Sequence, residues 1–343
     1  MSDEFSRMAR LNQLNSFRAI AAIMVCLYHA AFLLGEELPG VVQLMDWGQE
    51  GVYVFFVISG LVMPLALDKM KYRLADFGNF MFKRIIRLQP PLILSALVLT
   101  FLSFQRLKEL DFSMIELFLG SASLTAPIIG LPYVNDIYWT LFVEMQFYVY
   151  IGLLFPVLIT QNVRIRWVLT ILLLVFSFSS LAFDAKWIKL LLPFHLPVFL
   201  MGYFLFLSIT GRINNREFIW GIVTCTFCCA LLTGFFHELG YRIAGVAALT
   251  SVLIAYLKNG LRWLDRIGEF SYSLYLFHWI FISTMAHYAR PYFPGFMGAI
   301  ELYFIVILLC LVGSKLFYVI IEKPSLSWAR KFANKKTPPE TVK

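Results

Sequence analysis

The first long apolar run of the chain carries two residues that could do chemistry, Arg18 and His29. An imidazole accepts and returns a proton near neutral pH, and a guanidinium stabilises phosphate or developing negative charge. Their separation is close to three helical turns, so a helix places both side chains on one face, about 16 Å apart along its axis. Charged groups cost about 2.5–3.5 kcal/mol each inside a membrane helix, so they persist where they pair or line a polar cavity. The alternative is an arginine that reaches one interface and a histidine that bonds a neighbouring helix.

A third ionisable group, Glu144, interrupts another apolar run. If the N-terminus faces the cytoplasm, the helical rise places Glu144 about 10 Å and His29 about 9 Å below the outer surface. Two such groups at one depth on different helices fit a buried acid–base pair, because an unpaired buried carboxylate would be neutralised. The alternative is a structural hydrogen bond that locks the two helices together.

The next apolar run contains several small residues, among them Ser59 and Gly60. They favour close helix packing, and they also leave room for a ligand. Ser59 is a candidate nucleophile, but the sequence places no base beside it.

Lys83, Arg84 and Arg87 lie in a basic amphipathic stretch. Arg84 and Arg87 are three positions apart and share a helix face, and paired guanidinium groups suit phosphate. Attraction to anionic lipid headgroups is the alternative.

Two later apolar runs also carry polar side chains. His195 lies between two prolines. Prolines are tolerated in a membrane helix where a cavity or a neighbouring helix supplies hydrogen-bond partners for the freed backbone groups. The alternative is that His195 is an interfacial histidine. Tyr272, Tyr275 and His278 recur every third position and predict a polar ridge that ends near the membrane midplane.

Composition identifies the elements that must position these residues. The chain is 60% apolar and only 15% charged, with a mean hydropathy of +0.75, which excludes a soluble domain of this length. We therefore predict an all-α polytopic membrane protein. The five cysteines lie in apolar runs, so we predict neither a disulfide nor a metal site. The net charge of +8 is spread over many loops, which indicates a basic membrane-facing surface and no nucleic-acid partner.

Apolar windows of about twenty residues predict about ten transmembrane helices. They lie near residues 14–35, 48–67, 90–105, 137–160, 166–183, 190–210, 217–236, 240–258, 267–289 and 297–321. The basic amphipathic segment 72–89 is expected to lie along one interface. The segment 106–136 is expected to be a loop whose apolar middle dips into the protein.

Charge asymmetry orients this arrangement. Most of the 29 Lys and Arg residues fall on the N-terminal side of the membrane when ten helices alternate, so both termini are predicted to be cytoplasmic. The first helix lacks a cleavage site and is expected to be retained. We predict a cytoplasmic tail over 1–13, one transmembrane domain over 14–321 and a basic cytoplasmic tail over 322–343. The oligomeric state stays open.

Taken together, the motifs resemble those of acyltransferase family 3, in order and over nearly the whole chain. The motifs are Arg18-x10-His29, Phe55-Phe56-x-x-Ser59-Gly60, Lys83-Arg84-x-x-Arg87-Leu88-x-Pro90, Trp139-Thr140-Leu141-x-x-Glu144-x-x-Phe147-Tyr148, Ser271-Tyr272-Ser273-x-Tyr275-Leu276-x-His278 and Glu322-Lys323-Pro324. Members of this family are integral-membrane acyltransferases with about ten helices, mostly O-acetyltransferases of bacterial surface polysaccharides. Some add a soluble hydrolase-like domain, which we expect to be absent here.

The resemblance implies that Arg18 and His29 are essential, that cytoplasmic acyl-CoA is the donor, and that a glycan outside is the usual acceptor. We expect acyl-CoA, and acetyl-CoA in particular, as co-substrate, with no other cofactor. The acceptor is expected to be an O-antigen, an exopolysaccharide or a lipid-linked precursor, and the location the bacterial inner membrane, among its lipids. Binding to the donor is assigned to Lys83, Arg84 and Arg87. The acceptor is assigned to Ser59, Gly60, Trp139, His195, Tyr272, Tyr275 and His278.

The predicted reaction is O-acyl transfer with His29 as general base. Glu144 orients His29 and stabilises its imidazolium, and Arg18 stabilises donor phosphate or developing negative charge. A transient acyl-enzyme on His29 or Ser59 is an alternative within this class. A transporter or flippase of an anionic lipid-linked sugar is a second reading, because buried ionisable groups and proline-broken helices serve that too. Acylation of a small molecule or a lipid is a third.

Overall fold

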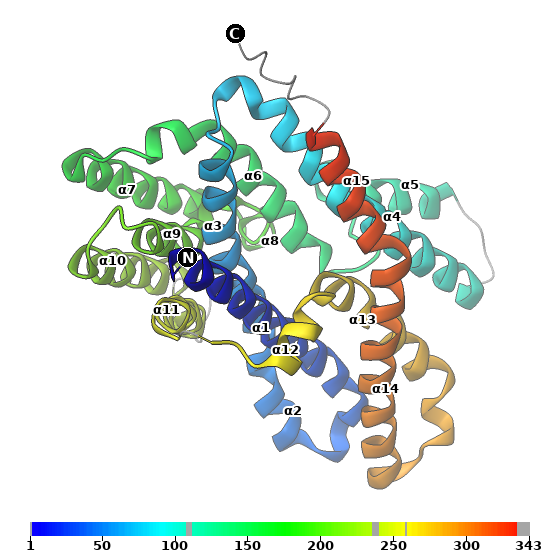
Figure 1. The fold of residues 1–343 in the computed structure, drawn as a ribbon. Coiled ribbons are helices and arrows are strands. Elements are labelled where there is room, and N and C mark those ends of the chain that lie inside the picture. Colours follow the sequence, from blue (N-terminus) through cyan, green and yellow to red (C-terminus); the bar gives the residue numbers. More distant parts are fainter. Residues whose placement is uncertain (1, 108–111, 235–239, 258, 335–343) are drawn as a thin grey trace. The chain divides into compact units, whose positions relative to one another are not determined.

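The structure, a computed structural model, describes residues 2–107, 112–234, 240–257 and 259–334. These residues are overwhelmingly helical and include no strand. Figure 1 shows the helices coloured in order along the sequence. The chain forms two compact units whose segments alternate along the sequence. Unit 1 comprises Met1–Tyr28, Leu44–Leu74 and Trp139–Ser271, and unit 2 comprises His29–Gln43, Ala75–Tyr138 and Tyr272–Lys343. Parts of the predicted tails, of the 106–136 loop and of the 217–236 and 240–258 helices lie outside the described residues.

Unit 1 is built around one buried apolar helix. It holds α1 (Ser2–Ala30) up to Tyr28, η2 (Asp46–Glu50), α3 (Gly51–Lys69), α6 (Tyr138–Leu158), α7 (Val163–Ser177), η5 (Phe178–Ala182), α8 (Ala185–Ile188), α9 (Leu192–Ile209), α10 (Asn215–Gly234), α11 (Gly240–Tyr256) and α12 (Arg262–Gly268). The centre is α9, which packs against α3, α7, α10 and α11 and is buried along most of its length.

Two glycines allow α3 and α9 to touch through their backbones. A Cβ atom on Gly60 would lie 2.1 Å from the carbonyl oxygen of Phe199, and one on Gly202 would lie 2.1 Å from that of Val57. Any larger side chain would push the helices apart. Helix packing therefore accounts for Gly60, which is one of the two roles that its sequence context predicts.

A proline in α6 leaves one backbone carbonyl without its helical hydrogen bond, and a side chain distant in sequence donates to it instead. Pro156 has no N–H, so the carbonyl of Gly152 has no donor from within the helix. The hydroxyl of Tyr72, in the segment after α3, donates to this oxygen at 2.7 Å. The interaction fastens that segment to α6 within unit 1.

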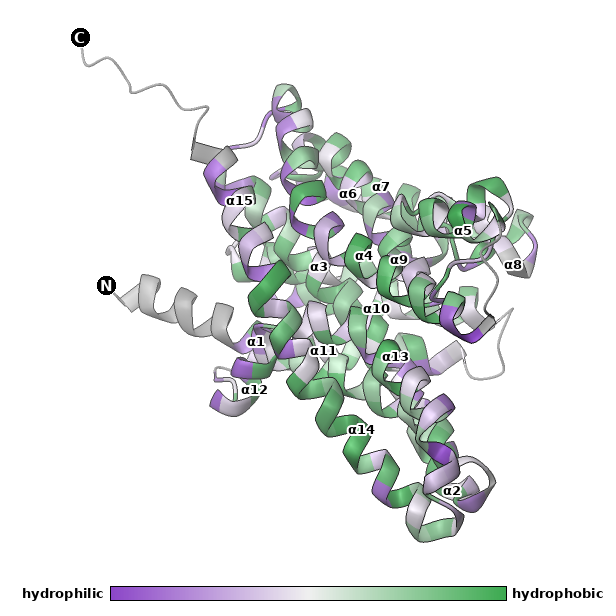
Figure 2. Cartoon of the chain, turned by 90° about the vertical axis from the view of Figure 1, so that its right-hand side faces the viewer, coloured by the Kyte–Doolittle hydropathy of each residue, from purple (hydrophilic) through white to green (hydrophobic). Residues whose placement is uncertain are grey.

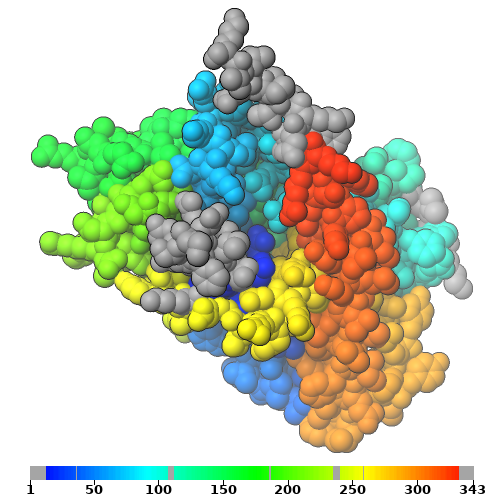
Figure 3. Space-filling view, viewed as in Figure 1, coloured from blue at the N-terminus to red at the C-terminus, as the bar shows by residue number. Residues whose placement is uncertain are grey.

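Unit 2 contains η1 (Ala31–Glu37), α2 (Pro39–Met45) up to Gln43, α4 (Phe77–Leu107), α5 (Phe112–Ala122), η4 (Ala126–Ile129), α13 (Ser271–Tyr288) from Tyr272, η6 (Arg290–Tyr292), α14 (Gly295–Phe317), η7 (Tyr318–Glu322) and α15 (Lys323–Asn334). A short helix, η3 (Leu74–Asp76), joins the two units in sequence. Hydrophobic residues predominate along α14 (Figure 2). Its exposed side chains include Phe304, Leu308, Val312 and Leu316, which recur every fourth position and form one apolar face suited to lipid. Both α14 and α15 lie at the molecular surface, coloured orange to red in Figure 3.

The boundary predicted between an interfacial segment over 72–89 and a membrane helix over 90–105 is wrong. The structure has one continuous helix, α4, which contains both Pro90 and Pro91. Pro91 leaves the carbonyl of Arg87 without its helical donor, and the hydroxyl of Ser325 in α15 lies 3.3 Å from that oxygen while it also donates to the carbonyl of Glu322 at 2.8 Å. Because α15 packs along α4 and supplies this donor, the helix continues through a site that would otherwise favour a break.

A buried carboxylate caps the start of α13. Glu322, only 3% exposed, accepts hydrogen bonds from the backbone N–H of Ser273 at 3.1 Å and from its hydroxyl at 2.7 Å. An anionic acceptor at a helix N-terminus satisfies an N–H that has no partner within the helix and interacts favourably with the helix dipole. The motif Glu322-Lys323-Pro324 therefore has a structural role in unit 2.

Eight helical segments in the described chain are long and apolar enough to cross a membrane. They are Gln13–Gly35, Pro39–Lys69, Leu74–Arg106, Tyr138–Leu158, Val163–Ala182, Leu192–Ile209, Asn215–Gly234 and Gly295–Lys331. The prediction of an all-α polytopic membrane protein is confirmed. The other two predicted spans are also helices, but α11 is short and α13 carries several serine, tyrosine and histidine side chains.

Candidate functional site

The predicted site residues fall into two groups. Unit 1 contains Arg18, Ser59, Gly60, Trp139, Glu144 and His195. Unit 2 contains His29, Lys83, Arg84, Arg87, Tyr272, Tyr275 and His278. Helix α1 carries Arg18 in its half-buried middle and His29 in its last turn, without a break between them.

Two histidines meet in unit 2. The Nε2 atom of His278 lies 3.3 Å from the Nδ1 atom of the half-buried His29. The Nδ1 atom of His278 lies 3.1 Å from the carbonyl oxygen of Leu274, one turn earlier in α13. Trp279, the next residue, contacts the His29 ring edge-on, with the ring centres 5.7 Å apart. A ring on α1 is thus held by two side chains of α13.

Hydroxyl groups fix α13 in place beside α4. The Tyr272 hydroxyl donates to the carbonyl of Leu88 at 2.9 Å, and the Ser95 hydroxyl donates to that of Leu276 at 3.1 Å. Tyr275 donates to the carbonyl of Ile137 at 3.1 Å. The two tyrosines that we predicted as part of a polar ridge therefore bond backbone, which makes α13 a rigid support for His278.

The basic stretch of α4 lies at the other end of this support. Lys83, Arg84 and Arg87 are half-buried, and the Arg84 guanidinium lies over the Phe80 ring at 5.4 Å from its centre. Leu88, the residue after Arg87, is the acceptor for Tyr272. From Tyr272 to His278 the helix advances about 9 Å, so the contact with Leu88 of α4 and the contact with His29 lie at the two ends of one short segment of α13.

In unit 1, Glu144 accepts two hydrogen bonds on one oxygen. The hydroxyl of Ser59 donates to Oε1 at 2.7 Å, and the hydroxyl of Tyr148 donates to the same atom at 2.5 Å. The predicted pairing of Glu144 with His29, which belongs to unit 2, stays a prediction.

His195 is surrounded by aromatic rings. Its side chain is 1% exposed, stacks on Trp139 with ring centres 5.4 Å apart, and lies 5.3 Å from Phe56 and 6.0 Å from Tyr53. Its Nε2 atom lies 2.9 Å from the carbonyl oxygen of Lys189, so Nε2 carries the proton. Its Nδ1 atom has no hydrogen-bond partner among the described residues. This buried ring is built into the packing around α9.

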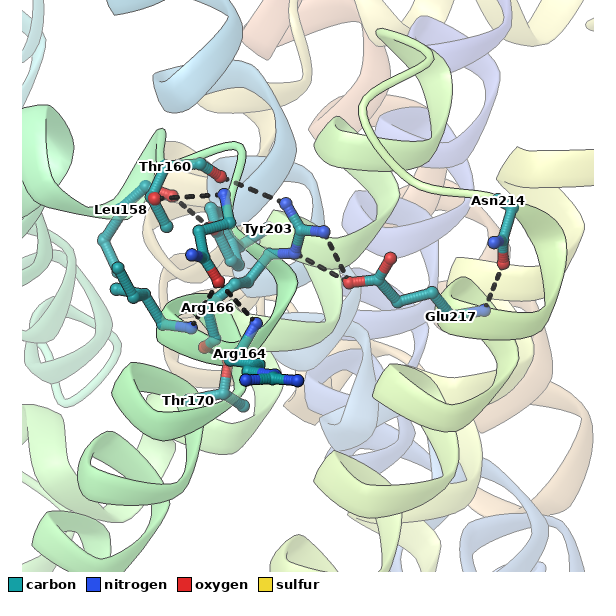
Figure 4. Close-up of polar contacts among 10 residues, drawn as sticks. Leu158, Thr160, Arg164, Arg166, Thr170, Tyr203, Asn214 and Glu217 are labelled. Atoms are coloured by element: carbon teal, nitrogen blue, oxygen red, sulfur yellow. Dashed lines mark hydrogen bonds and ion pairs between the residues drawn. The ribbon is translucent and has the colours of Figure 1, made fainter.

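Several basic residues counted for orientation are ion-paired in unit 1. Arg166 binds Glu217 at 2.7 Å and also donates to the carbonyl of Thr160 at 3.1 Å (Figure 4). The two side chains of this ion pair are only 3% and 11% exposed. Arg212 pairs with Asp68 in the same unit. These contacts fasten helix ends, which removes these arginines from the candidates for ligand binding.

Three side-chain contacts, made by Tyr148, Glu322 and His278, were not evident from the residue types alone. Tyr148 follows Glu144 by one helical turn, and that spacing is a signal that could have found it. Glu322 and His278 act on residues far away in sequence, which local spacing does not reveal. Among the described residues, no three His, Cys, Asp or Glu side chains are grouped to hold a metal ion.

Comparison with known proteins gives one match. The family model described as an acyltransferase domain, that of acyltransferase family 3, matches residues 11–319. No match is found among curated proteins or among solved structures.

Proposed function

The chain belongs to acyltransferase family 3, and from this premise we propose that it transfers an acyl group, acetyl in particular, from acyl-CoA to a sugar hydroxyl. The proposed acceptor is an envelope polysaccharide or its lipid-linked precursor, and the proposed location is the bacterial inner membrane. The observation that carries the proposal is the histidine pair of unit 2, at one end of a helix segment whose other end is bonded to the basic stretch of α4.

The proposed reaction needs only a base and a way to hold the donor. The acceptor oxygen bonds to the thioester carbonyl carbon while His29 takes the hydroxyl proton. The carbon–sulfur bond then breaks with its electron pair on sulfur, and the His29 imidazolium returns the proton to the thiolate. The products are an O-acyl ester and free CoA.

The donor is proposed to bind through its phosphates. Lys83, Arg84 and Arg87 supply the cations, of which the two arginines donate in the planar fork that matches phosphate oxygens. Arg18 is proposed to stabilise donor phosphate or the negative charge that develops on the carbonyl oxygen. Glu144 is proposed to orient His29 and to stabilise its imidazolium, as the sequence predicts.

The test of this function is release of CoA from acetyl-CoA by the purified protein in detergent, with glycan acceptor added. We expect His29→Ala to lower turnover by roughly 10²–10⁴-fold, the usual contribution of a general base. The matched control is His287→Ala, since His287 lies in the last turn of α13, at the opposite end of that helix from the basic stretch of α4. Normal acetylation by a well-folded His29→Ala protein would contradict the proposal.

The same assay separates the alternatives. Release of CoA with lipid or small-molecule acceptors, but not with glycan, would identify a different acceptor class. Failure of the wild-type protein to release CoA with any acceptor would favour a transporter of an anionic lipid-linked sugar. A covalent label after incubation with acetyl-CoA carrying a labelled acetyl group would establish an acyl-enzyme in place of direct transfer.

A further inference from the structure

We propose that His278 is a positioning residue that selects Nε2 of His29 as the basic atom of the site. The inference rests on the proposed function and assigns a role to a residue that the sequence indicated only as a contact to substrate. Its starting point is the pair of contacts made by the two nitrogen atoms of the His278 ring.

The first contact determines where the proton of His278 lies. A backbone carbonyl oxygen accepts hydrogen bonds and cannot donate them, so Nδ1 of His278 must carry the hydrogen that points at Leu274. This carbonyl belongs to α13 itself, one turn before His278, so the acceptor is supplied by the same helix. In the side-chain conformation of the structure, the proton of neutral His278 lies on Nδ1.

The second step is that His278 is neutral. Its side chain is fully buried and contacts His29, the Leu274 carbonyl and the Tyr275 ring, none of which carries a negative charge. An imidazolium in such surroundings loses its hydration without gaining a counter-charge. A neutral ring with its proton on Nδ1 has a lone pair on Nε2.

The tautomer of His29 follows from that lone pair. At 3.3 Å from Nε2 of His278, Nδ1 of His29 donates a hydrogen, so the lone pair of a neutral His29 lies on Nε2. The bond persists when Nε2 takes a proton, because Nδ1 keeps its own. The edge contact of Trp279 restrains the same ring in rotation.

This arrangement divides two tasks that a single carboxylate performs in hydrolytic triads. His278 sets the tautomer and direction of the base but brings no charge. Stabilisation of the imidazolium falls to a separate anion, the role proposed above for Glu144.

Two amide substitutions at His278 test the assignment atom by atom. In His278→Gln the side-chain oxygen reaches the former position of Nε2 and accepts from His29. In His278→Asn the amide reaches only the former position of Nδ1, so it bonds Leu274 and leaves His29 without its acceptor. We expect His278→Gln to keep kcat within about tenfold, and His278→Asn to lower kcat by roughly 10²-fold, since a misplaced proton removes most of the general-base contribution.

The KM for acyl-CoA should stay within about threefold in both variants, because neither change touches the basic stretch of α4. Equal kcat values for the two amides, or a change in KM alone, would overturn the assignment. If His29→Ala is inactive while His278→Asn is fully active, this inference fails and the proposed function stands. If His29→Ala is active, the proposed function fails.

A direct measurement on the wild-type protein does not depend on folding of a variant. The chain has five histidines, so the ring nitrogens of protein labelled with [15N]histidine can be assigned by NMR with the His29→Ala and His278→Gln proteins as references. We expect a hydrogen on Nδ1 and a bare Nε2 for both His29 and His278 at neutral pH. A hydrogen on Nε2 of His29 in place of Nδ1 would overturn the proposal.

Discussion

At the scale of single residues, hydroxyl groups and histidines have different tasks around α13. The hydroxyls of Tyr272 and Tyr275 bond backbone carbonyls, so they hold helices together. His278 bonds a backbone carbonyl with one nitrogen and His29 with the other. The two ring nitrogens of one side chain can thus have different roles, one structural and one in the chemistry. Substitutions at such a residue must therefore be chosen to replace one nitrogen and keep the other.

The basic stretch of α4 gives a prediction at this scale. Replacing Arg84 or Arg87 by alanine removes a cation proposed to bind donor phosphate, so the KM for acyl-CoA should rise about tenfold, which corresponds to ~1.4 kcal/mol, with kcat nearly unchanged. Initial rates over a range of acyl-CoA concentrations measure the effect. Lysine at either position should restore only part of it, because lysine keeps the charge but lacks the planar fork.

The matched control is Arg164→Ala, which removes an exposed arginine at the start of α7 in unit 1. Its KM should equal that of the wild type. If Arg84→Ala, Arg87→Ala and the control all leave KM unchanged, these arginines do not bind the donor, and a role in binding anionic lipid is then favoured.

At the scale of elements, two prolines inside helices are compensated from outside. Ser325 bonds the carbonyl that Pro91 leaves in α4, and Tyr72 bonds the one that Pro156 leaves in α6. Each donor comes from a distant part of the chain within the same unit. Prolines that would end a helix in isolation here become points at which another segment is attached.

This compensation predicts a measurable loss of stability in Tyr72→Phe. The ring stays but the hydroxyl goes, so the buried carbonyl of Gly152 loses its donor, at a cost of about 1–3 kcal/mol. We expect a lower Tm for the variant in detergent, with the KM for acyl-CoA unchanged. Tyr241→Phe, which removes the hydroxyl of an exposed tyrosine, is the control. Equal Tm values for both variants would show that the Gly152 carbonyl finds another donor.

Helix positions were largely readable from the sequence, because an apolar run of about twenty residues is long enough to cross a membrane as a helix. The error at α4 arose because Pro90 and Pro91 favour a break, while the Ser325 donor that offsets it lies more than two hundred positions later. The residues of the candidate site could also be predicted from the sequence, but their contacts could not. Residue type singled out His29 and His278, but their contact joins residues 249 positions apart, and no local spacing encodes it.

At the scale of the whole molecule, the distribution of basic residues predicts both termini in the cytoplasm. The arginines paired in unit 1 do not weaken this prediction, because the rule counts Lys and Arg and not net charge. A green fluorescent protein fused to the C-terminus should therefore fluoresce, whereas alkaline phosphatase at the same position should be inactive. Fusions after Gly130, in a predicted outer loop, should give the reverse result. An active phosphatase at the C-terminus would contradict the predicted topology.

The polar character of α13 has a consequence for how the protein is made. This helix carries His278 and is not among the eight segments that are long and apolar enough to cross a membrane, so it gains little by entering lipid alone. Its hydroxyls find acceptors on α4 and near Ile137, both of which are synthesised earlier. Insertion of α13 should therefore wait for helices already in the membrane. The segment that is proposed to position the base would then be the one whose biogenesis depends most on the rest of the chain.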